Sequence, residues 1–260
     1  VSARENGNIH ALKEKIAALV HSVPPARELI ADLVSPGDAV VLVTPIDSAA
    51  PKGRLILPQQ QTIRSLLDAG CIPVVTRETE LARTLSRLRE PQALVVTDSQ
   101  AFGMVSRIVP DSVRLTSFSI LFARYKGDLR TAVLGAAALR RLKDGDTVLI
   151  SEGCTHHRQC GDIGTEKLPR WVRQYTGRDI RFVFTSGGEF PENLSPYALI
   201  IHCGACMLGE REMQSRLRRA AEQCIPVTNY GIAIAQIHGI LDRALRPFSA
   251  LHAEWEKQQQ

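Results

Sequence analysis

The sequence is short of aromatic residues, cysteines and long apolar runs, and each shortage excludes a class of protein. Only 5% of its 260 residues are aromatic, and no basic segment is interleaved with rings as in proteins that stack single-stranded nucleic acid. Six cysteines are few for a chain of this length held together by disulfides. No apolar run approaches the ~20 residues that a membrane-spanning helix needs. We therefore expect a globular protein with neither nucleic acid nor a membrane among its partners.

The chain also lacks the features of an exported or complete protein. Its first residues, VSARENGNIH, contain no initiator Met and no basic stretch followed by the apolar run of a secretory signal. The net charge of +5 comes from arginines spread over helix-like stretches such as 81–89 and 211–219, as on solvated helix faces. We expect a cytoplasmic protein that is a fragment of a longer one.

The sequence does contain a regular alternation of Val- and Ile-rich runs with amphipathic stretches. Residues 39–43, 72–76 and 147–150 have the composition of buried strands, and residues 60–69 have the apolar spacing of a helix. Such alternation is typical of βαβ units and a parallel sheet. The predicted fold class is α/β, with two tandem parallel-sheet domains, the second of them doubly wound and Rossmann- or flavodoxin-like.

Two domains are expected because 260 residues are too many for one small core. The segment TSFSILFARYKGD interrupts the alternation, which places the joint near residue 116. The predicted parts are residues 1–23, which end in a helix and linker, then residues 24–115 and residues 116–260. Near the C-terminus we expect one helix over residues 232–245 and a frayed tail, WEKQQQ.

Cysteine and histidine residues follow two of the predicted strands. Cys154 and His156 come after DTVLI, and His202, Cys203 and Cys206 come after YALII. Ligands of open parallel sheets bind at the carboxyl ends of strands, so the two motifs meet in space if these strands are neighbours. The C-x-x-C spacing lets two thiolates reach one metal centre. The sequence therefore predicts a metal site at this sheet edge, with a loop that curls tightly at Gly204.

Three kinds of site use such spacing. A redox dithiol has no need of an adjacent histidine or of a distant C-x-H motif. Zinc could take three thiolates and one imidazole in a closed tetrahedral site, although an α/β domain with a sizeable core has little need of a structural metal. Chemistry alone leaves zinc and an iron–sulfur cluster both open.

Three segments, CTHHRQCGDIGTEKLPRW, HCGACM and VTNYGIAIAQIHG, together resemble HydF, the family of maturation factors of [FeFe]-hydrogenases. The family motif is C-x-H, a gap of about 45 residues, then H-C-x-x-C. Here 45 residues separate His156 from His202. The resemblance extends upstream through PIDSAAPKGRLILPQQQTIRSLLDAG and SFSILFARYKGD, so that it covers nearly the whole chain.

The resemblance implies a particular domain order and cofactor. Residues 1–23 look like the end of a GTPase domain, residues 24–115 like a dimerisation domain, and residues 116–260 like a domain that binds a [4Fe-4S] cluster. No G-x-x-x-x-G-K-[ST] loop occurs in the sequence, so GTP, Mg²⁺ and GTP hydrolysis are expected of a missing GTPase domain. The chain itself is expected to be a scaffold and not an enzyme.

For the site, the resemblance implies that Cys154, Cys203 and Cys206 are permanent cluster ligands, with His156 or His202 at a labile fourth position. The implied function is to carry a di-iron precursor with CO, cyanide and a dithiolate bridge, and to pass it to apo-hydrogenase. The implied partners are apo-[FeFe]-hydrogenase, the radical-SAM co-maturases HydE and HydG, and a second copy in a homodimer. The alternatives are a zinc-stabilised interaction module of a GTPase and a redox iron–sulfur protein.

Other residues near these motifs have simpler explanations. His157 and Cys160 are expected to be bystanders, and Cys71 and Cys224 to pack in cores. Tyr230 and Gly231 should lie at the same sheet edge as the cysteines. A further group could either line the cavity or turn the chain: Asp162, Gly164 and Lys167.

Overall fold

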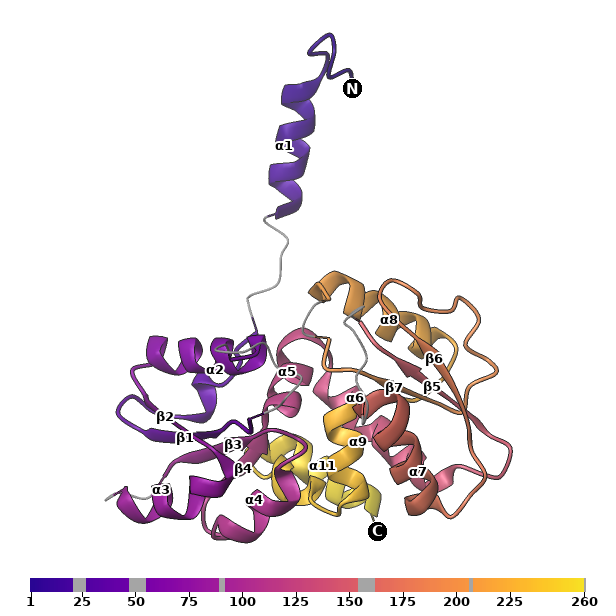
Figure 1. The fold of residues 1–260 in the computed structure, drawn as a ribbon. Coiled ribbons are helices and arrows are strands. Elements are labelled where there is room, and N and C mark those ends of the chain that lie inside the picture. The colour runs from indigo at the N-terminus through magenta and orange to yellow at the C-terminus, as the bar shows by residue number, and fades with distance from the viewer. Residues whose placement is uncertain (21–26, 47–54, 89–91, 154–161, 206–207, 260) are drawn as a thin grey trace.

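The computed structural model describes residues 1–20, 27–46, 55–88, 92–153, 162–205 and 208–259. These residues form two four-stranded sheets in which every strand pairing is parallel (Figure 1). The predicted fold class, two tandem parallel-sheet α/β domains, is confirmed. None of the described helices is long and apolar enough to cross a membrane.

The first sheet has the strand order β2-β1-β3-β4. Its strands are β1 (Ala39–Val43), β2 (Ile72–Thr76), β3 (Leu94–Thr97) and β4 (Leu115–Ser117). Helices α2 (Leu57–Asp68) and α5 (Phe118–Lys126) contribute to the core on one face, and α3 (Leu81–Arg87) and α4 (Phe102–Ile108) to the core on the other. Because both faces are covered, the central strands consist almost entirely of Val and Leu. Short 3₁₀ turns lie at Ala31–Leu33 and Glu78–Glu80.

The second sheet has the order β6-β5-β7-β8. Its strands are β5 (Thr147–Ser151), β6 (Arg181–Thr185), β7 (Leu199–His202) and β8 (Val227–Asn229). Helices α7 (Leu168–Thr176) and α9 (Tyr230–Ile237) cover one face, and α8 (Glu210–Glu222) covers the other. Helix α6 (Leu129–Ala136) lies against β8 and continues into a 3₁₀ turn, Ala137–Arg141, and a π turn, Ile163–Lys167, precedes α7.

Both sheets therefore have the same strand order: second, first, third and fourth strand along the chain. This is the order with which flavodoxin-like sheets begin. In each sheet, the second strand along the chain pairs with one side of the first strand, and the third strand pairs with its other side. In open α/β sheets, ligands bind at such a reversal, beyond the carboxyl ends of the two central strands. In the second sheet the two central strands are β5 and β7.

The C-terminal region differs from the prediction in two ways. The helix expected over residues 232–245 is two helices, α9 and α10 (Leu241–Leu245), because Gly239 has a φ of +70° and ends the first of them. Residues 255–259 of the tail expected to be frayed belong to α11 (Ser249–Gln259), where Trp255 is only 3% exposed. Trp255 and the apolar residues of α10 belong to the same core as Val41 and Val95 of the first sheet. Helix α10 thus packs against β4 of the first sheet, and α11 packs against α10 and α6.

Two further elements lie at the joint and at the N-terminus. The interrupting segment forms α5, whose N-cap is Ser117 with its hydroxyl accepting from the Ile120 amide. The predicted joint near residue 116 falls in β4, and the domain boundaries stay a prediction. Helix α1 (Ile9–Val20) extends away from both sheets (Figure 1).

Candidate functional site

The two cysteine motifs follow strands that are neighbours. Strands β5 and β7 pair in parallel with Ser151 opposite His202, so the loops after them start side by side at the carboxyl ends of these strands. The backbone amide of Gly153, one residue before Cys154, donates to the Cys203 thiol sulfur at 3.0 Å. Because β5 and β7 are adjacent, the two loops begin side by side, which the two motifs need in order to share one site.

Several predicted site residues lie outside the described residues. These are Cys154, His156, His157, Cys160 and Cys206. The ligand set of three cysteines, and the fourth position with it, stays a prediction.

The Cys203 sulfur accepts two backbone amides. Besides Gly153, the amide of Ala205 donates to it at 3.4 Å. Ala205 has a φ of +52° and is buried, a left-handed conformation that costs a non-glycine residue about 1–2 kcal/mol and is concentrated at functional sites. The expectation that Gly204 provides the tight curl is wrong, because Gly204 has no positive φ and an added Cβ meets no described atom within 4 Å. The strained residue is Ala205.

Glycine is required on the opposite loop. A Cβ on Gly153 would lie 2.6 Å from Cγ of Leu208, on the far side of the C-x-x-C segment. Any larger residue would force the Leu208 side chain to move, so glycine favours this close approach of the loop after β5 to the loop after β7. The sequence pattern did not single out Gly153, because its partner is more than fifty residues away.

His202 ends β7 and is 1% exposed. Its Nδ1 lies 2.9 Å from the carbonyl oxygen of Cys203, and its Nε2 lies 3.0 Å from Nη1 of Arg216 on α8. Burial lowers the pKa of His202 to about 4, so the ring is neutral at physiological pH. Both ring nitrogens of this candidate fourth ligand are hydrogen-bonded within the protein.

A buried acid and a half-buried phenol, Glu152 and Tyr230, lie at the same sheet edge. The Tyr230 hydroxyl donates to Oε1 of Glu152 at 3.2 Å, and burial together with the Glu152 carboxylate raises the pKa of Tyr230. A Cβ on Gly164 would lie 2.3 Å from the Tyr230 oxygen and 2.5 Å from Glu152 Oε1. Tyr230 is thus placed as expected, and Gly164 is needed for close packing. Glu152 was missed because a single acid after a strand carries no pattern.

The remaining candidates have structural roles. Asp162 caps the turn before α7, and its carboxylate accepts hydrogen bonds from the amide and hydroxyl of Thr165. Of the two roles considered for it, it therefore turns the chain. The Lys167 ammonium donates to Oε1 of Gln100 in the first domain. Cys71 is buried as expected. The core position expected for Cys224 is wrong: it is exposed, with a φ of +56°, in the turn that ends α8.

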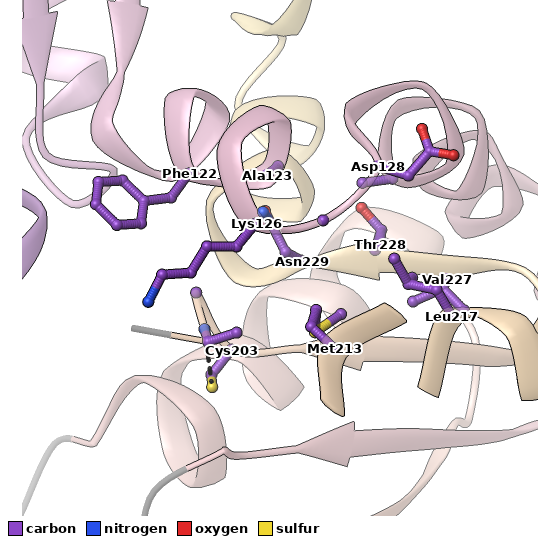
Figure 2. Close-up of a pocket in the computed structure, with 14 residues that line it drawn as sticks. Phe122, Ala123, Lys126, Asp128, Cys203, Met213, Leu217, Val227, Thr228 and Asn229 are labelled. Atoms are coloured by element: carbon purple, nitrogen blue, oxygen red, sulfur yellow. Dashed lines mark hydrogen bonds between the residues drawn. The ribbon is translucent and has the colours of Figure 1, made fainter. Parts of the chain in front are cut away.

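A small cavity adjoins Cys203 and lies between α5, which flanks the first sheet, and elements of the second sheet (Figure 2). Phe122 and Lys126 line it from α5, and Met213 lines it from α8. The Lys126 ammonium lies 5.8 Å from the centre of the Phe122 ring, a favourable cation–π position. Sequence patterns missed this lining because α5 flanks the first sheet and carries none of the metal-binding residues.

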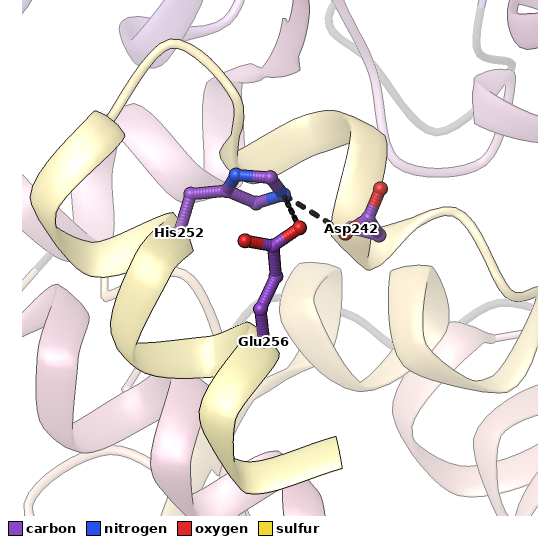
Figure 3. Close-up of side chains that lie close together, drawn as sticks. All are labelled: Asp242, His252 and Glu256. Atoms are coloured by element: carbon purple, nitrogen blue, oxygen red, sulfur yellow. Dashed lines mark hydrogen bonds and ion pairs between the residues drawn. The ribbon is translucent and has the colours of Figure 1, made fainter. Parts of the chain in front are cut away.

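Another group with metal-binding residue types lies between α10 and α11 (Figure 3). His252 Nε2 is 2.8 Å from Oδ1 of Asp242 and 4.0 Å from Oε1 of Glu256. Asp242 also pairs with Arg246 at 3.4 Å. The His252–Asp242 contact joins the two C-terminal helices, and the other two contacts each link residues four positions apart. All are ordinary surface contacts.

Comparisons with known proteins give the family. The model of the hydrogen maturase F dimerization domain matches residues 29–127, and the model of the hydrogen maturase F tetramerization domain matches residues 130–247. No curated protein matches the chain. Among solved structures, an ABC transporter solute-binding protein from Burkholderia multivorans is 12% identical, covering 86% of this chain and 94% of its own, with a TM-score of 0.25, which is too low to support an argument. On the two domain matches, the chain belongs to the hydrogen maturase F family, HydF, and is a hydrogenase maturation protein.

Proposed function

We propose that this chain holds a [4Fe-4S] cluster through Cys154, Cys203 and Cys206, and acts as the scaffold that carries a di-iron precursor to apo-[FeFe]-hydrogenase. The observation that carries the proposal is the contact of the loop before Cys154 with the sulfur of Cys203, at the carboxyl ends of β5 and β7. Three thiolates reach one centre if the two loops meet there.

The described residues fit a thiolate-bound cluster. Two backbone amides donate to the Cys203 sulfur, and such hydrogen bonds stabilise a deprotonated sulfur and tune a cluster's reduction potential. When bound, a cubane with three protein thiolates supplies one iron whose remaining ligand can exchange. A carrier needs such an open position, whereas an electron-transfer site has no need of it.

The surrounding residues would shape the space beside that iron. The Tyr230–Glu152 pair and Gly164 close one side of the sheet edge. On the other side, Lys126 brings a positive charge to the cavity that Cys203 lines. A cyanide-bearing di-iron precursor is anionic, so a nearby ammonium favours its binding.

The first test is metal content after anaerobic purification. Cys203→Ala should lose most of its iron and sulfide per chain, because one of three permanent ligands is gone. Cys224→Ala is the matched control, since this exposed cysteine lies in the turn after α8, and it should keep the wild-type content. Full retention by Cys203→Ala, or zinc in place of iron and sulfide in the wild type, contradicts the proposal.

The second test separates a carrier from an electron-transfer protein. Titration of the reduced protein with cyanide or imidazole should change the cluster spectrum, because one iron accepts an added ligand. The protein loaded with precursor should then activate apo-hydrogenase, and HydE and HydG should supply that precursor. A cluster that ignores both added ligands would instead favour a redox role.

A further inference from the structure

The strongest feature not explained by cluster ligation is a buried arginine beside the cysteine loop. Arg216, on α8, is 2% exposed. Its Nε donates to Oε1 of Glu212 at 2.8 Å and its Nη2 to the carbonyl oxygen of Gly187 at 2.7 Å. The guanidinium also stacks 5.1 Å from the centre of the Phe190 ring. A charge this deeply buried is stable only with most of its donors satisfied.

The remaining nitrogen of Arg216 faces the two central strands. Nη1 lies 3.4 Å from the Ser151 hydroxyl at the end of β5 and 3.0 Å from Nε2 of His202 at the end of β7. The Ser151 hydroxyl in turn accepts from Thr185 on β6. One guanidinium therefore contacts the carboxyl ends of both strands that lead into the cysteine loops.

The hydrogen-bonding chemistry of arginine determines which ring nitrogen of His202 carries the proton. A guanidinium has donors only, so Nε2 must be the acceptor, and the proton of the neutral ring is then on Nδ1. From there it can donate to the carbonyl oxygen of Cys203 at 2.9 Å. This is the arrangement by which a second shell orients a ligand residue.

We propose that His202 is a positioning residue and not an iron ligand: Arg216 holds its ring in the Nδ1–H tautomer, and the ring holds the backbone of Cys203 so that the sulfur faces the metal site. The proposal rests on the proposed function for the identity of the group that Cys203 binds. For Nε2 to reach an iron, the ring would have to leave Arg216, and the buried Nη1 would keep only its long contact of 3.4 Å with the Ser151 hydroxyl. Among the family's two histidines, this leaves His156 as the candidate for the fourth position.

The first experiment uses the wild-type protein and needs no cluster. Long-range ¹H–¹⁵N NMR of histidine-labelled apo-protein at neutral pH should show one ring with a protonated Nδ1 and an unprotonated, hydrogen-bonded Nε2. Its assignment comes from the loss of that signal in His202→Asn. A ring protonated on Nε2 would overturn the proposal. Because this readout is independent of metal, it stands apart from a failure to find iron and sulfide.

The second experiment compares variants loaded with the cluster. In His202→Asn the side-chain amide can still donate to the Cys203 carbonyl but is a poor iron ligand, so iron, sulfide and the ¹⁴N hyperfine spectrum of the reduced cluster should stay as in the wild type. His202→Ala and Arg216→Gln should each release iron to a chelator about tenfold faster, and the double variant should be no faster than either.

Arg219→Gln is the matched control. Arg219 lies on the same helix and near the same Phe190 ring, yet donates to the carbonyl oxygens of Phe190 and Pro191 and not to His202. It should release iron at the wild-type rate. Loss of nitrogen coupling in His202→Asn, or equal release rates for Arg216→Gln and Arg219→Gln, would overturn the proposal.

Discussion

At the scale of single residues, one glycine allows a helix to touch a strand. Gly135 lies on α6, and an added Cβ there would stand 1.9 Å from the carbonyl oxygen of Val227 on β8. Because the obstacle is backbone, no side chain can move aside to make room. Gly103 on α4 offers the contrast, since a Cβ there meets nothing within 4 Å.

We expect Gly135→Ala to lower the free energy of unfolding by about 3 kcal/mol, because α6 must move away from β8. Gly103→Ala should raise it by about 0.5–1 kcal/mol, because alanine loses less entropy in a helix. Urea denaturation followed by circular dichroism measures both. Equal effects of the two substitutions would mean that α6 and β8 are not packed this closely in solution.

Residues with a short-range signature could be predicted, and residues whose partners are distant in sequence could not. Cys203 was found from its spacing to Cys206. Arg216 was not, since a lone arginine on a polar helix has the pattern of a solvated face, and only tertiary packing buries it. The tight turn of this loop was likewise predicted at Gly204 and lies at Ala205, because the conformational freedom of glycine favours it wherever a loop turns.

At the scale of elements, the C-terminal helices complete a core that begins near residue 40. Leu241 and Leu245 of α10 and Trp255 of α11 share one apolar cluster with Val41 of β1. The contact of His252 with Asp242 joins the two helices on their exposed side, and Arg246 pairs with Asp242 at the end of α10. Apolar burial and not these exposed pairs should dominate the stability of this region.

Trp255→Ala should therefore cost about 3–5 kcal/mol of stability, the usual range for a buried tryptophan. Glu256→Ala, one position along the same helix and half exposed, should cost less than about 1 kcal/mol. Thermal unfolding followed by calorimetry checks both values. A small effect of Trp255→Ala would show that α11 is not packed into this core.

Helices and strands could be predicted where the residue types and the spacing of the apolar residues indicate the same element. Strands β1 and β2 have the predicted bounds, because runs of Val and Ile between turn residues fit little else. Helix α5 was missed because it starts directly after β4, and Ser117 serves as both the end of the strand and the N-cap of the helix. No loop residues mark that boundary in the sequence.

At the scale of the whole molecule, each sheet has one edge strand with exposed apolar side chains. On β2, Ile72 and Val75 are 57% and 45% exposed, and on β6, Val183 and Phe184 are 38% and 39% exposed. Edge strands of this kind readily pair with another chain. The matching family domains are a dimerization and a tetramerization domain, so we expect self-association through these two edges.

Ile72→Lys should convert the dimer to monomers, because a charge on the β2 edge opposes pairing of two copies. Phe184→Lys should leave the dimer intact and remove only larger assemblies. Sedimentation velocity distinguishes the species, and each variant is the control for the other. If both variants have the same oligomeric state, the two edges do not have separate roles.

The place of Trp255 in the apolar cluster that includes Val41 has a consequence for synthesis of the protein. Domains generally fold from the N-terminus onward as a chain leaves the ribosome. Here the first sheet emerges early together with α3 and α4, but the apolar cluster on that face lacks the residues of α10 and α11 until nearly the end of the chain is translated. The nascent first domain therefore has to wait, with apolar surface exposed, for the second domain to be made, and this interval is when chaperone binding should matter most.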